Sequence, residues 1–213
     1  KNKIISEAEA NRIMAFYNIN TSRPIICQVS RFDPWKDPLG TLKAFYIAKN
    51  EFPGLQLILA GIFQAYDDPE AVEVFERVKK QVKGDSSVFL FSDPNCLKDI
   101  SNDLLINAIY TASTVVVQKS LKEGFGLTVT EAMWKGKPVV GGQTSGIALQ
   151  IKNGQNGFLV KDIKEAGYRI TELMKYPELR EQLGQAAHKS VKNNFLISRL
   201  VLDHLRSYDY LIQ

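Results

Sequence analysis

The sequence predicts an α/β domain in which a parallel sheet carries helices on both faces, a doubly wound arrangement. Two observations predict this fold class. Short segments that are apolar throughout recur along the chain, and connectors of helix length separate them. Parallel strands are buried on both faces and need long crossover connections, so they produce this pattern. The chain of 213 residues has the length of one generous domain, and we expect one.

Six segments have the length and apolar character of buried strands. The predicted strands are 24–30, 55–61, 87–91, 113–118, 137–142 and 157–160. Helices are predicted between them, near 37–51, 69–83, 101–112 and 127–135. The C-terminal part, 163–213, is expected to be mainly helical, with periodic segments over 163–175, 177–193 and 195–211 and a break at Pro177.

The loops that follow the strands are where we expect a ligand, because open parallel sheets bind ligands beyond the carboxyl ends of their strands. These loops are 31–38, 62–69, 92–97, 119–127 and 142–147. Two of them carry charged residues and glycines in a pattern that indicates a site.

Composition narrows the class of function. A net charge of +4, spread along the chain, does not favour a nucleic acid partner, and no apolar run approaches the roughly 18 residues of a membrane span. Cys27 and Cys96 lie far apart in apolar surroundings, which predicts reduced, buried thiols in a cytoplasmic protein. With two His residues and no clustered ligands, no metal site is expected. The chain starts at Lys1, so we expect an excised piece of a longer protein, of undetermined oligomeric state.

The segment "SRFDPWKDP", residues 30–38, follows the first predicted strand and contains two cations. Arg31 and Lys36 suit a diphosphate, because a guanidinium grips two phosphate oxygens and an ammonium supplies a compact charge. If a bond to that diphosphate breaks, both cations also stabilise the charge on the leaving group. The alternative is that Arg31 pairs with Asp33 or Asp37 on the surface and that Lys36 is solvated.

The segment "QKSLKEGFGLTVTEAMWKGKPVV", residues 118–140, joins a strand end to a helix start through two glycines. Backbone N–H groups of Gly124, Phe125, Gly126 and Leu127 are expected to point outward there, where the helix dipole favours an anion. Glycine also lets a ligand come close to the backbone. The segment has neither the Gly-Lys-Ser/Thr ending of a P-loop nor the dinucleotide-binding fingerprint.

Two carboxylates flank this helix start. Glu131 lies about one turn into the helix and can overhang the loop that holds Glu123, because helical side chains lean toward the N-terminus. The pair has three interpretations: ordinary surface charges near a helix dipole, the acid and nucleophile or base of a glycosidase, or acceptors for sugar hydroxyls. Only the third also explains the glycine loop and the two cations, so we favour a nucleotide-sugar site.

These residues resemble a known family. Arg31 and Lys36 in "SRFDPWKDP", followed by the E-x7-E element "EGFGLTVTE", are similar to the donor half of retaining GT-B glycosyltransferases. Four segments are most similar in sequence to the trehalose glycosyltransferring synthase and trehalose phosphorylase group. They are "SRFDPWKDP", "DDPEA" (67–71), the 118–142 segment and "GIALQI". The likeness runs from about residue 24 to 195.

The resemblance implies a role for each matched residue. Arg31 and Lys36 would hold the donor diphosphate, Glu123 would contact hydroxyls of the donor sugar, and Glu131 would bind the ribose hydroxyls. Arg31, Lys36 and Glu123 would be the catalytic residues of this half. Amides of 124–127 would complete the contacts, and the loop from Phe91 to Leu97 would lie near the base. Such enzymes transfer with retention and need no metal.

The resemblance also implies an architecture and a reaction. GT-B enzymes have two Rossmann-like domains, so residues 1–213 would be the donor-binding domain, and the N-terminal acceptor domain would be absent from this chain. The expected reaction makes trehalose from a nucleoside-diphosphate-glucose and glucose. The alternatives are a trehalose phosphorylase, which uses phosphate or glucose 1-phosphate, and a nucleotide-binding module that is inactive as a fragment.

Two departures from the family pattern narrow the range of activities that the resemblance implies. Many relatives have Lys-Gly where this chain has Lys36-Asp37, and many have Gly-x-Pro-Glu where this chain has "GIALQI". The second departure removes a carboxylate. It shifts the balance toward the trehalose-type group and away from a generic sucrose- or mannose-type activity.

Overall fold

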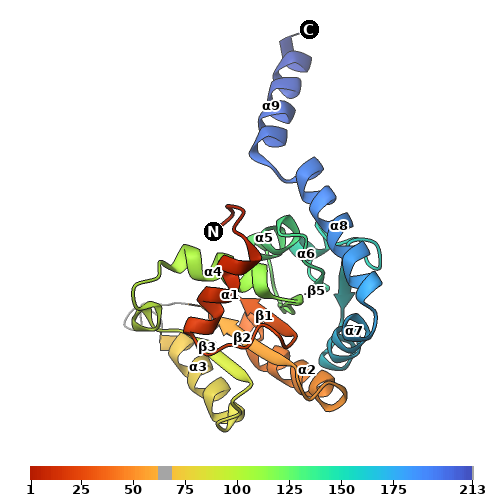
Figure 1. Cartoon of the computed structure of the whole chain (residues 1–213). Coiled ribbons are helices and arrows are strands. Elements are labelled where there is room, and N and C mark those ends of the chain that lie inside the picture. Colours follow the sequence, from red (N-terminus) through yellow and green to blue (C-terminus); the bar gives the residue numbers. More distant parts are fainter. Residues whose placement is uncertain (62–68, 213) are drawn as a thin grey trace.

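The computed structural model describes residues 1–61 and 69–212 of the chain (Figure 1). It contains a six-stranded sheet in the order β3-β2-β1-β4-β5-β6, and each neighbouring pair is parallel. The strands are β1 (Ile25–Val29), β2 (Gln56–Ala60), β3 (Val88–Phe91), β4 (Val115–Gln118), β5 (Val139–Gly142) and β6 (Phe158–Val160). The six predicted strands and the doubly wound α/β fold class are therefore confirmed.

The helices cover both faces of this sheet, as Figure 1 shows. They are α1 (Glu7–Phe16), α2 (Pro38–Glu51), α3 (Pro69–Val82), α4 (Asn102–Ala112), α5 (Leu127–Trp134), α6 (Ser145–Ala148), α7 (Ile163–Lys175), α8 (Pro177–Asn194) and α9 (Ile197–Ile212). Two short 3₁₀ helices, η1 (Pro34–Lys36) and η2 (Pro94–Leu97), lie in loops that follow strands. The predicted helices are observed, and the predicted C-terminal helical segment contains α7, α8 and α9.

Alternate residues of each strand point to opposite layers, because successive side chains of a strand face opposite sides. Cys27 and Val116 belong to one apolar core, which α1, α4 and α5 cover. Ile26 and Val117 belong to the other, which α2, α3 and α7 cover, and α8 contributes to both. This two-sided burial explains why the strands are apolar throughout.

Two helices were not predicted from the sequence. The first, α1, packs against α4 and starts at Ser6, whose side chain accepts a hydrogen bond from the Glu9 N–H at 3.1 Å. Ser followed three residues later by Glu is a capping-box signal, so this start was readable from the sequence. The second, α6, is a single turn in the loop that follows β5 and is too short to show periodicity.

The strand order places a switch point between β1 and β4. The chain moves outward from β1 to β2 and β3, then returns to the other side of β1 as β4 and continues to β5 and β6. The loops after β1 and β4 therefore diverge at the carboxyl edge of the sheet. This is the place where open α/β sheets bind ligands.

The last helix, α9, extends away from the body of the protein (Figure 1). None of its residues is buried, although they include many apolar side chains. The exposed ones are Ile197, Leu200, Val201, Leu202, Leu205, Tyr208, Tyr210, Leu211 and Ile212. Within residues 1–61 and 69–212, no helix is long and apolar enough to cross a membrane.

The two cysteines have different environments. Cys27 is fully buried in β1, and this burial raises the pKa of its thiol to about 12. Cys96 lies in η2 and is only partly buried. Both thiols are free, so the prediction of reduced thiols holds, but the prediction of burial is wrong for Cys96, because η2 is a surface turn after β3.

One ion pair ties α2 to the amino end of β3. The Lys49 ammonium lies 2.6 Å from the Asp85 carboxylate, which also accepts hydrogen bonds from the N–H and hydroxyl of Ser87. Burial opposes ionisation of Asp85, but the hydrogen bonds from Lys49 and Ser87 and the charge of Lys49 outweigh it and lower the pKa to about 2. The ionised carboxylate therefore stabilises the folded state.

Asp85→Asn is expected to lower the free energy of unfolding by about 1–2 kcal/mol at neutral pH. The unfolded pKa is about 3.9, so this stabilisation is present above about pH 4 and is lost as the pH falls toward 2. The measurement is urea unfolding at pH 7 and near pH 3. Glu76→Gln, at an exposed pair with Lys79, is the control and should change stability by less than about 0.5 kcal/mol. An equal loss for Asp85→Asn at both pH values would contradict the assignment.

Candidate functional site

The loop after β1 is held by its own side chains. Asp33 precedes η1, and its carboxylate accepts a hydrogen bond from the Lys36 N–H at 3.0 Å. Asp37 follows in the left-handed conformation, with φ of 49°, and accepts from the Gly40 N–H at 2.9 Å at the start of α2. The Gln28 amide donates to the Lys36 carbonyl at 2.7 Å. The backbone that carries Lys36 is therefore fixed from three sides.

The loop after β4 leads into α5 through Gly126. This residue has φ of 88°, which favours glycine, and no side chain caps the helix that follows it. The first N–H groups of an α-helix have no partner within the helix. The start of α5 thus offers backbone donors, with the positive end of the helix dipole, at the edge of the sheet where ligands bind.

Lys36 and Glu123 bring these two loops together. The Lys36 ammonium lies 2.5 Å from the Glu123 carboxylate, and their side chains are only 21% and 10% exposed. The Ser120 hydroxyl lies 3.5 Å from the same carboxylate oxygen. The alternative in which Lys36 is a solvated surface charge is therefore wrong.

Arg31 fits the surface alternative better. Its guanidinium lies 3.2 Å from the Asp33 carboxylate, and its side chain is 67% exposed. The pairing with Asp33 that this alternative allowed is therefore observed, while Asp37 pairs with another residue. Arg31 lies in the same loop as Lys36, and the Asp33 carboxylate that it contacts also accepts the Lys36 N–H.

Further contacts join the two loops, and the sequence did not reveal them. Lys119 places its ammonium 2.5 Å from the Asp37 carboxylate, with only 5% of its side chain exposed. The Leu121 N–H donates to the Trp35 carbonyl at 2.7 Å, and the Lys122 ammonium lies 3.9 Å from the centre of the Trp35 ring. A lysine next to a strand end gives no signal for such pairs, because the partner lies more than eighty residues away.

Glu131 is buried in α5, so it is not an ordinary surface charge. Its carboxylate lies 2.9 Å from the Lys1 ammonium and accepts a hydrogen bond from the Tyr110 hydroxyl at 3.4 Å. Burial, together with the Glu131 charge, raises the pKa of Tyr110 well above its usual value. The two predicted carboxylates therefore have separate partners, with Glu123 on Lys36 and Glu131 on Lys1.

A pocket of about 350 Å³ adjoins Glu131. Its wall is mostly apolar and is formed by Asn2, Leu127, Thr130, Glu131, Trp134, Val191, Phe195 and Leu196. Leu127, which was predicted as a binding residue, is 67% exposed there. Phe125 is 38% exposed, and its ring centre lies 5.9 Å from that of Phe195.

The glycine loop rests on the α6 segment. The Gly146 N–H donates to the Glu123 carbonyl at 3.2 Å, and a Cβ at Gly146 would lie 2.5 Å from the Gly124 carbonyl. The Gln150 amide donates to the carbonyls of Phe125 and Gly126. The segment "GIALQI", residues 146–151, thus supplies a glycine and a glutamine that hold the loop.

The remaining predicted loops contribute less. The loop 62–69 falls almost entirely on residues 62–68, which lie outside the described residues. The loop 92–97 contains η2, whose first turn is capped by the Asp93 side chain. Within residues 1–61 and 69–212, no three or more His, Cys, Asp or Glu side chains gather as a metal-binding group would require.

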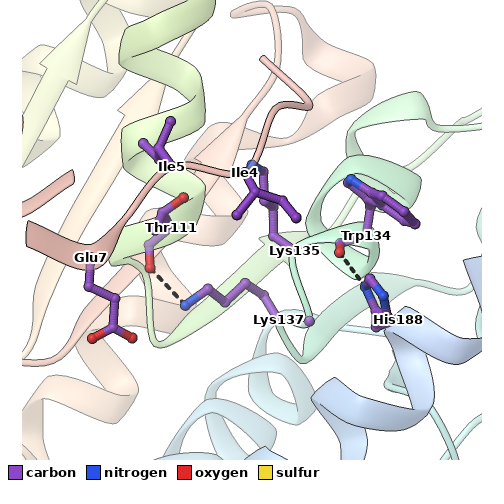
Figure 2. Close-up of a pocket in the computed structure, with 9 residues that line it drawn as sticks. Ile4, Ile5, Glu7, Thr111, Trp134, Lys135, Lys137 and His188 are labelled. Atoms are coloured by element: carbon purple, nitrogen blue, oxygen red, sulfur yellow. Dashed lines mark hydrogen bonds between the residues drawn. The ribbon is translucent and has the colours of Figure 1, made fainter. Parts of the chain in front are cut away.

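Figure 2 shows a second pocket, of about 340 Å³, where α4 and α5 end and β5 begins. Lys137 donates from its ammonium to the Thr111 carbonyl at 2.8 Å, and burial lowers the pKa of that ammonium. Helix C-termini attract cations and disfavour anions, and the Lys137 ammonium here is bound to a backbone carbonyl of α4. Trp134 lines it and stacks on His188 with ring centres 4.8 Å apart.

Gly146→Ala is expected to lower the free energy of unfolding by about 1–3 kcal/mol, because the added methyl group must displace the Gly124 backbone. Gly54→Ala is the matched control, since a Cβ there meets nothing within 4 Å, and it should stay within about 0.5 kcal/mol of wild type. Urea unfolding of the three proteins measures both effects. Equal stability of the Gly146 variant and wild type would show that the loop does not rest on α6 in this way.

Comparisons with known proteins show the family of this chain. Residues 9–190 match the family described as glycosyl transferases group 1. The chain is 40% identical to the trehalose synthase of Pyrococcus horikoshii over 208 residues, which cover 98% of this chain and 48% of that protein. It is 39% identical to the trehalose synthase of Rubrobacter xylanophilus over 212 residues, covering 100% and 50%. The trehalose phosphorylase of Pleurotus pulmonarius is more distant, at 33% over 148 residues, covering 65% and 20%.

Solved structures show the same fold. Sucrose-phosphate synthase from Thermosynechococcus elongatus superposes with a TM-score of 0.75 at 26% identity, covering 96% of this chain and 49% of that one. The Anabaena protein HepE, solved with UDP-glucose, gives a TM-score of 0.76 at 19% identity, covering 95% and 54%. At that identity the second likeness concerns the fold alone.

The chain spans about half the length of the trehalose synthases that it matches. The family match covers most of the chain, and the whole chain aligns with relatives at close to 40% identity. The GT-B resemblance drawn from the sequence is thereby confirmed, and the chain belongs to the glycosyl transferases group 1 family.

Proposed function

We propose that this chain binds the nucleoside-diphosphate-glucose donor of a retaining glucosyltransferase. The whole protein would make trehalose from that donor and glucose. The observation that carries the proposal is the meeting of Lys36 and Glu123 at 2.5 Å beside the uncapped start of α5. A cation, a carboxylate and free helix N–H groups in one place match a ligand that carries both phosphate and hydroxyl groups.

The diphosphate would lie at the start of α5. Lys36 would donate from its ammonium to a phosphate oxygen, and Arg31, in the same loop, would add a guanidinium. Amides of Gly124, Phe125 and Gly126 and the first amides of α5 would donate to the remaining oxygens. These donors stabilise the negative charge that grows on the diphosphate as the bond to glucose breaks.

Carboxylates would bind the hydroxyl groups of the sugar and the ribose. Glu123 would accept hydrogen bonds from hydroxyls of glucose once the donor draws Lys36 toward the phosphate. Glu131 would accept from the ribose hydroxyls, and its burial next to an apolar pocket fits a group that meets a nucleoside rather than bulk water. HepE, which shares the fold, was solved with UDP-glucose, and this supports a donor of that class.

No metal is needed in this scheme, because Arg31 and Lys36 would take the place of a cation bound to the diphosphate. Retention of configuration is the stereochemical outcome that the family resemblance implies. Two free thiols fit a cytoplasmic location for the protein.

The acceptor site would lie on a second domain. The relatives are about twice as long as this chain, which leaves room for an N-terminal acceptor domain. The exposed apolar side chains of α9 offer a surface for such a domain to cover. We therefore expect the chain alone to bind donor nucleotide and to show little or no transfer.

Trehalose phosphorylase is the alternative reaction. Phosphate would then occupy the place of the diphosphate, and Glu131 would have no ribose to bind. The higher identity and coverage of the trehalose synthases favour the synthase. For the full-length protein, release of trehalose from glucose and a nucleotide-glucose would select the synthase, and a requirement for glucose 1-phosphate would select the phosphorylase.

Isothermal titration calorimetry of this chain with ADP, UDP, GDP and inorganic phosphate tests the donor role. At least one nucleoside diphosphate is expected to bind, and Lys36→Met should weaken it roughly 10- to 100-fold, because a hydrogen bond to a charged group contributes about 1.5–3 kcal/mol. Lys175→Met, at an exposed pair with Glu51, is the control and should leave affinity unchanged. Absence of binding for all nucleoside diphosphates would overturn the proposal.

The ribose role has its own test. Glu131→Gln should lower the affinity for the nucleoside diphosphate by about tenfold and leave the affinity for inorganic pyrophosphate unchanged, because pyrophosphate has no ribose. Lys36→Met should weaken both ligands. Equal losses for the two ligands in the Glu131 variant would contradict a ribose contact.

A further inference from the structure

Two ion pairs of opposite polarity join the same two loops. Lys36 from the β1 loop pairs with Glu123 from the β4 loop, whereas Asp37 from the β1 loop pairs with Lys119 from the β4 loop. Lys36 and Asp37 are consecutive, so the second pair lies one residue from the first. Neither Asp37 nor Lys119 belongs to the proposed donor contacts.

The Asp37 pair contains the more buried of the two lysines. Lys119 has 5% of its side chain exposed, against 21% for Lys36, while Asp37 is 18% and Glu123 is 10% exposed. Both Asp37 oxygens are used, one by the Gly40 N–H at 2.9 Å and the other by the Lys119 ammonium at 2.5 Å. A Cβ at position 40 would lie 2.1 Å from the Asp37 carboxylate, so only glycine leaves room for it.

The backbone at Asp37 also indicates a positional role. Its φ of 49° and ψ of 54° are left-handed, a conformation that few residues other than glycine adopt, Asp and Asn being the commonest of them. Burying an ion pair brings a desolvation cost that often cancels its attraction. The position that the Asp37–Lys119 pair gives to the two loops therefore explains it better than added stability does.

That use follows from what donor binding would require. A nucleoside-diphosphate sugar would draw the Lys36 ammonium to phosphate and the Glu123 carboxylate to sugar hydroxyls, so the pair between them would open. The loops would then lose one of their connections at the moment when their spacing must stay fixed. The Asp37 pair, with no free oxygen and little solvent contact, would remain closed.

We propose that Asp37 and Lys119 are positioning residues. Their ion pair keeps the β1 and β4 loops at a fixed spacing while Lys36 and Glu123 separate from each other and bind the donor. This inference rests on the proposed donor site. Lys119 acts through the peptide that carries Lys36 and does not itself bind the ligand. The hydrogen bond from the Leu121 N–H to the Trp35 carbonyl supports the same register.

The test measures affinity of this chain for ADP and UDP by calorimetry. Lys119→Met and Asp37→Asn should each lower the affinity for the nucleoside diphosphate at least fivefold. The affinity of Lys119→Arg should stay within twofold of the wild-type value. Asn tolerates the left-handed backbone and can still accept from the Gly40 N–H, so Asp37→Asn removes only the charge. If Lys119→Met does not fold, the double variant Asp37→Asn/Lys119→Met, which leaves no unpaired charge, takes its place with the same expectation.

A second measurement separates positioning from general destabilisation. In a Lys36→Met background, Lys119→Met should cause less than a twofold further loss, because the group that it positions is already absent. The matched control is Lys49→Met. Lys49 belongs to a pair of similar length, 2.6 Å, at the opposite edge of the sheet, and its loss should lower thermal stability while leaving affinity unchanged.

The outcomes are distinguishable. Wild-type protein that binds no nucleoside diphosphate would overturn the donor-site proposal itself. If wild type binds, three results would overturn the positioning role alone. The first is unchanged affinity in Lys119→Met. The second is the full loss of affinity again when Lys119→Met is added to Lys36→Met, and the third is a similar loss in Lys49→Met. Higher affinity in Asp37→Asn would also overturn it, because Lys119 would then be a phosphate-binding cation that Asp37 masks.

Discussion

The ion pair between Lys36 and Glu123 is the contact on which the rest of the site depends. It joins two loops that leave neighbouring strands at the switch point of the sheet, and it lies beside the start of α5. An ammonium and a carboxylate that neutralise each other at little solvent exposure are stable without a ligand. In the proposed function they would separate, because a donor with phosphate and hydroxyl groups would offer the ammonium an anion and the carboxylate hydrogen-bond donors.

Much of the surrounding structure serves to hold these two side chains. Asp33 and Gln28 fix the peptide of Lys36, while Gly146 and Gln150 fix the backbone around Glu123. The glycines permit backbone to approach backbone closely, which is why a methyl group at Gly146 is not tolerated without a shift. The second ion pair, from Lys119 to Asp37, then adds a connection that a ligand would not disturb.

The sequence predicted the elements that depend on local pattern and missed the contacts that depend on the fold. Buried parallel strands were readable because both faces are apolar, and Lys36 and Glu123 were readable because each follows a strand of the predicted sheet. The Lys119–Asp37 pair was not predicted, because its members lie far apart in the chain and no local pattern links one to the other. Glu131 was predicted to share a site with Glu123, but its observed partners, Lys1 and Tyr110, come from segments whose position no local pattern reveals. The helix α1 had a capping signal that could have been used.

The most direct measurement is a crystal structure of this chain with UDP or ADP bound. We expect the diphosphate at the start of α5, with Lys36 turned from Glu123 to a phosphate oxygen, the ribose at Glu131, and the Lys119–Asp37 pair still closed. A nucleotide bound elsewhere, for example in the pocket beside Lys137, or a diphosphate that leaves the Lys36–Glu123 pair intact, would contradict this expectation.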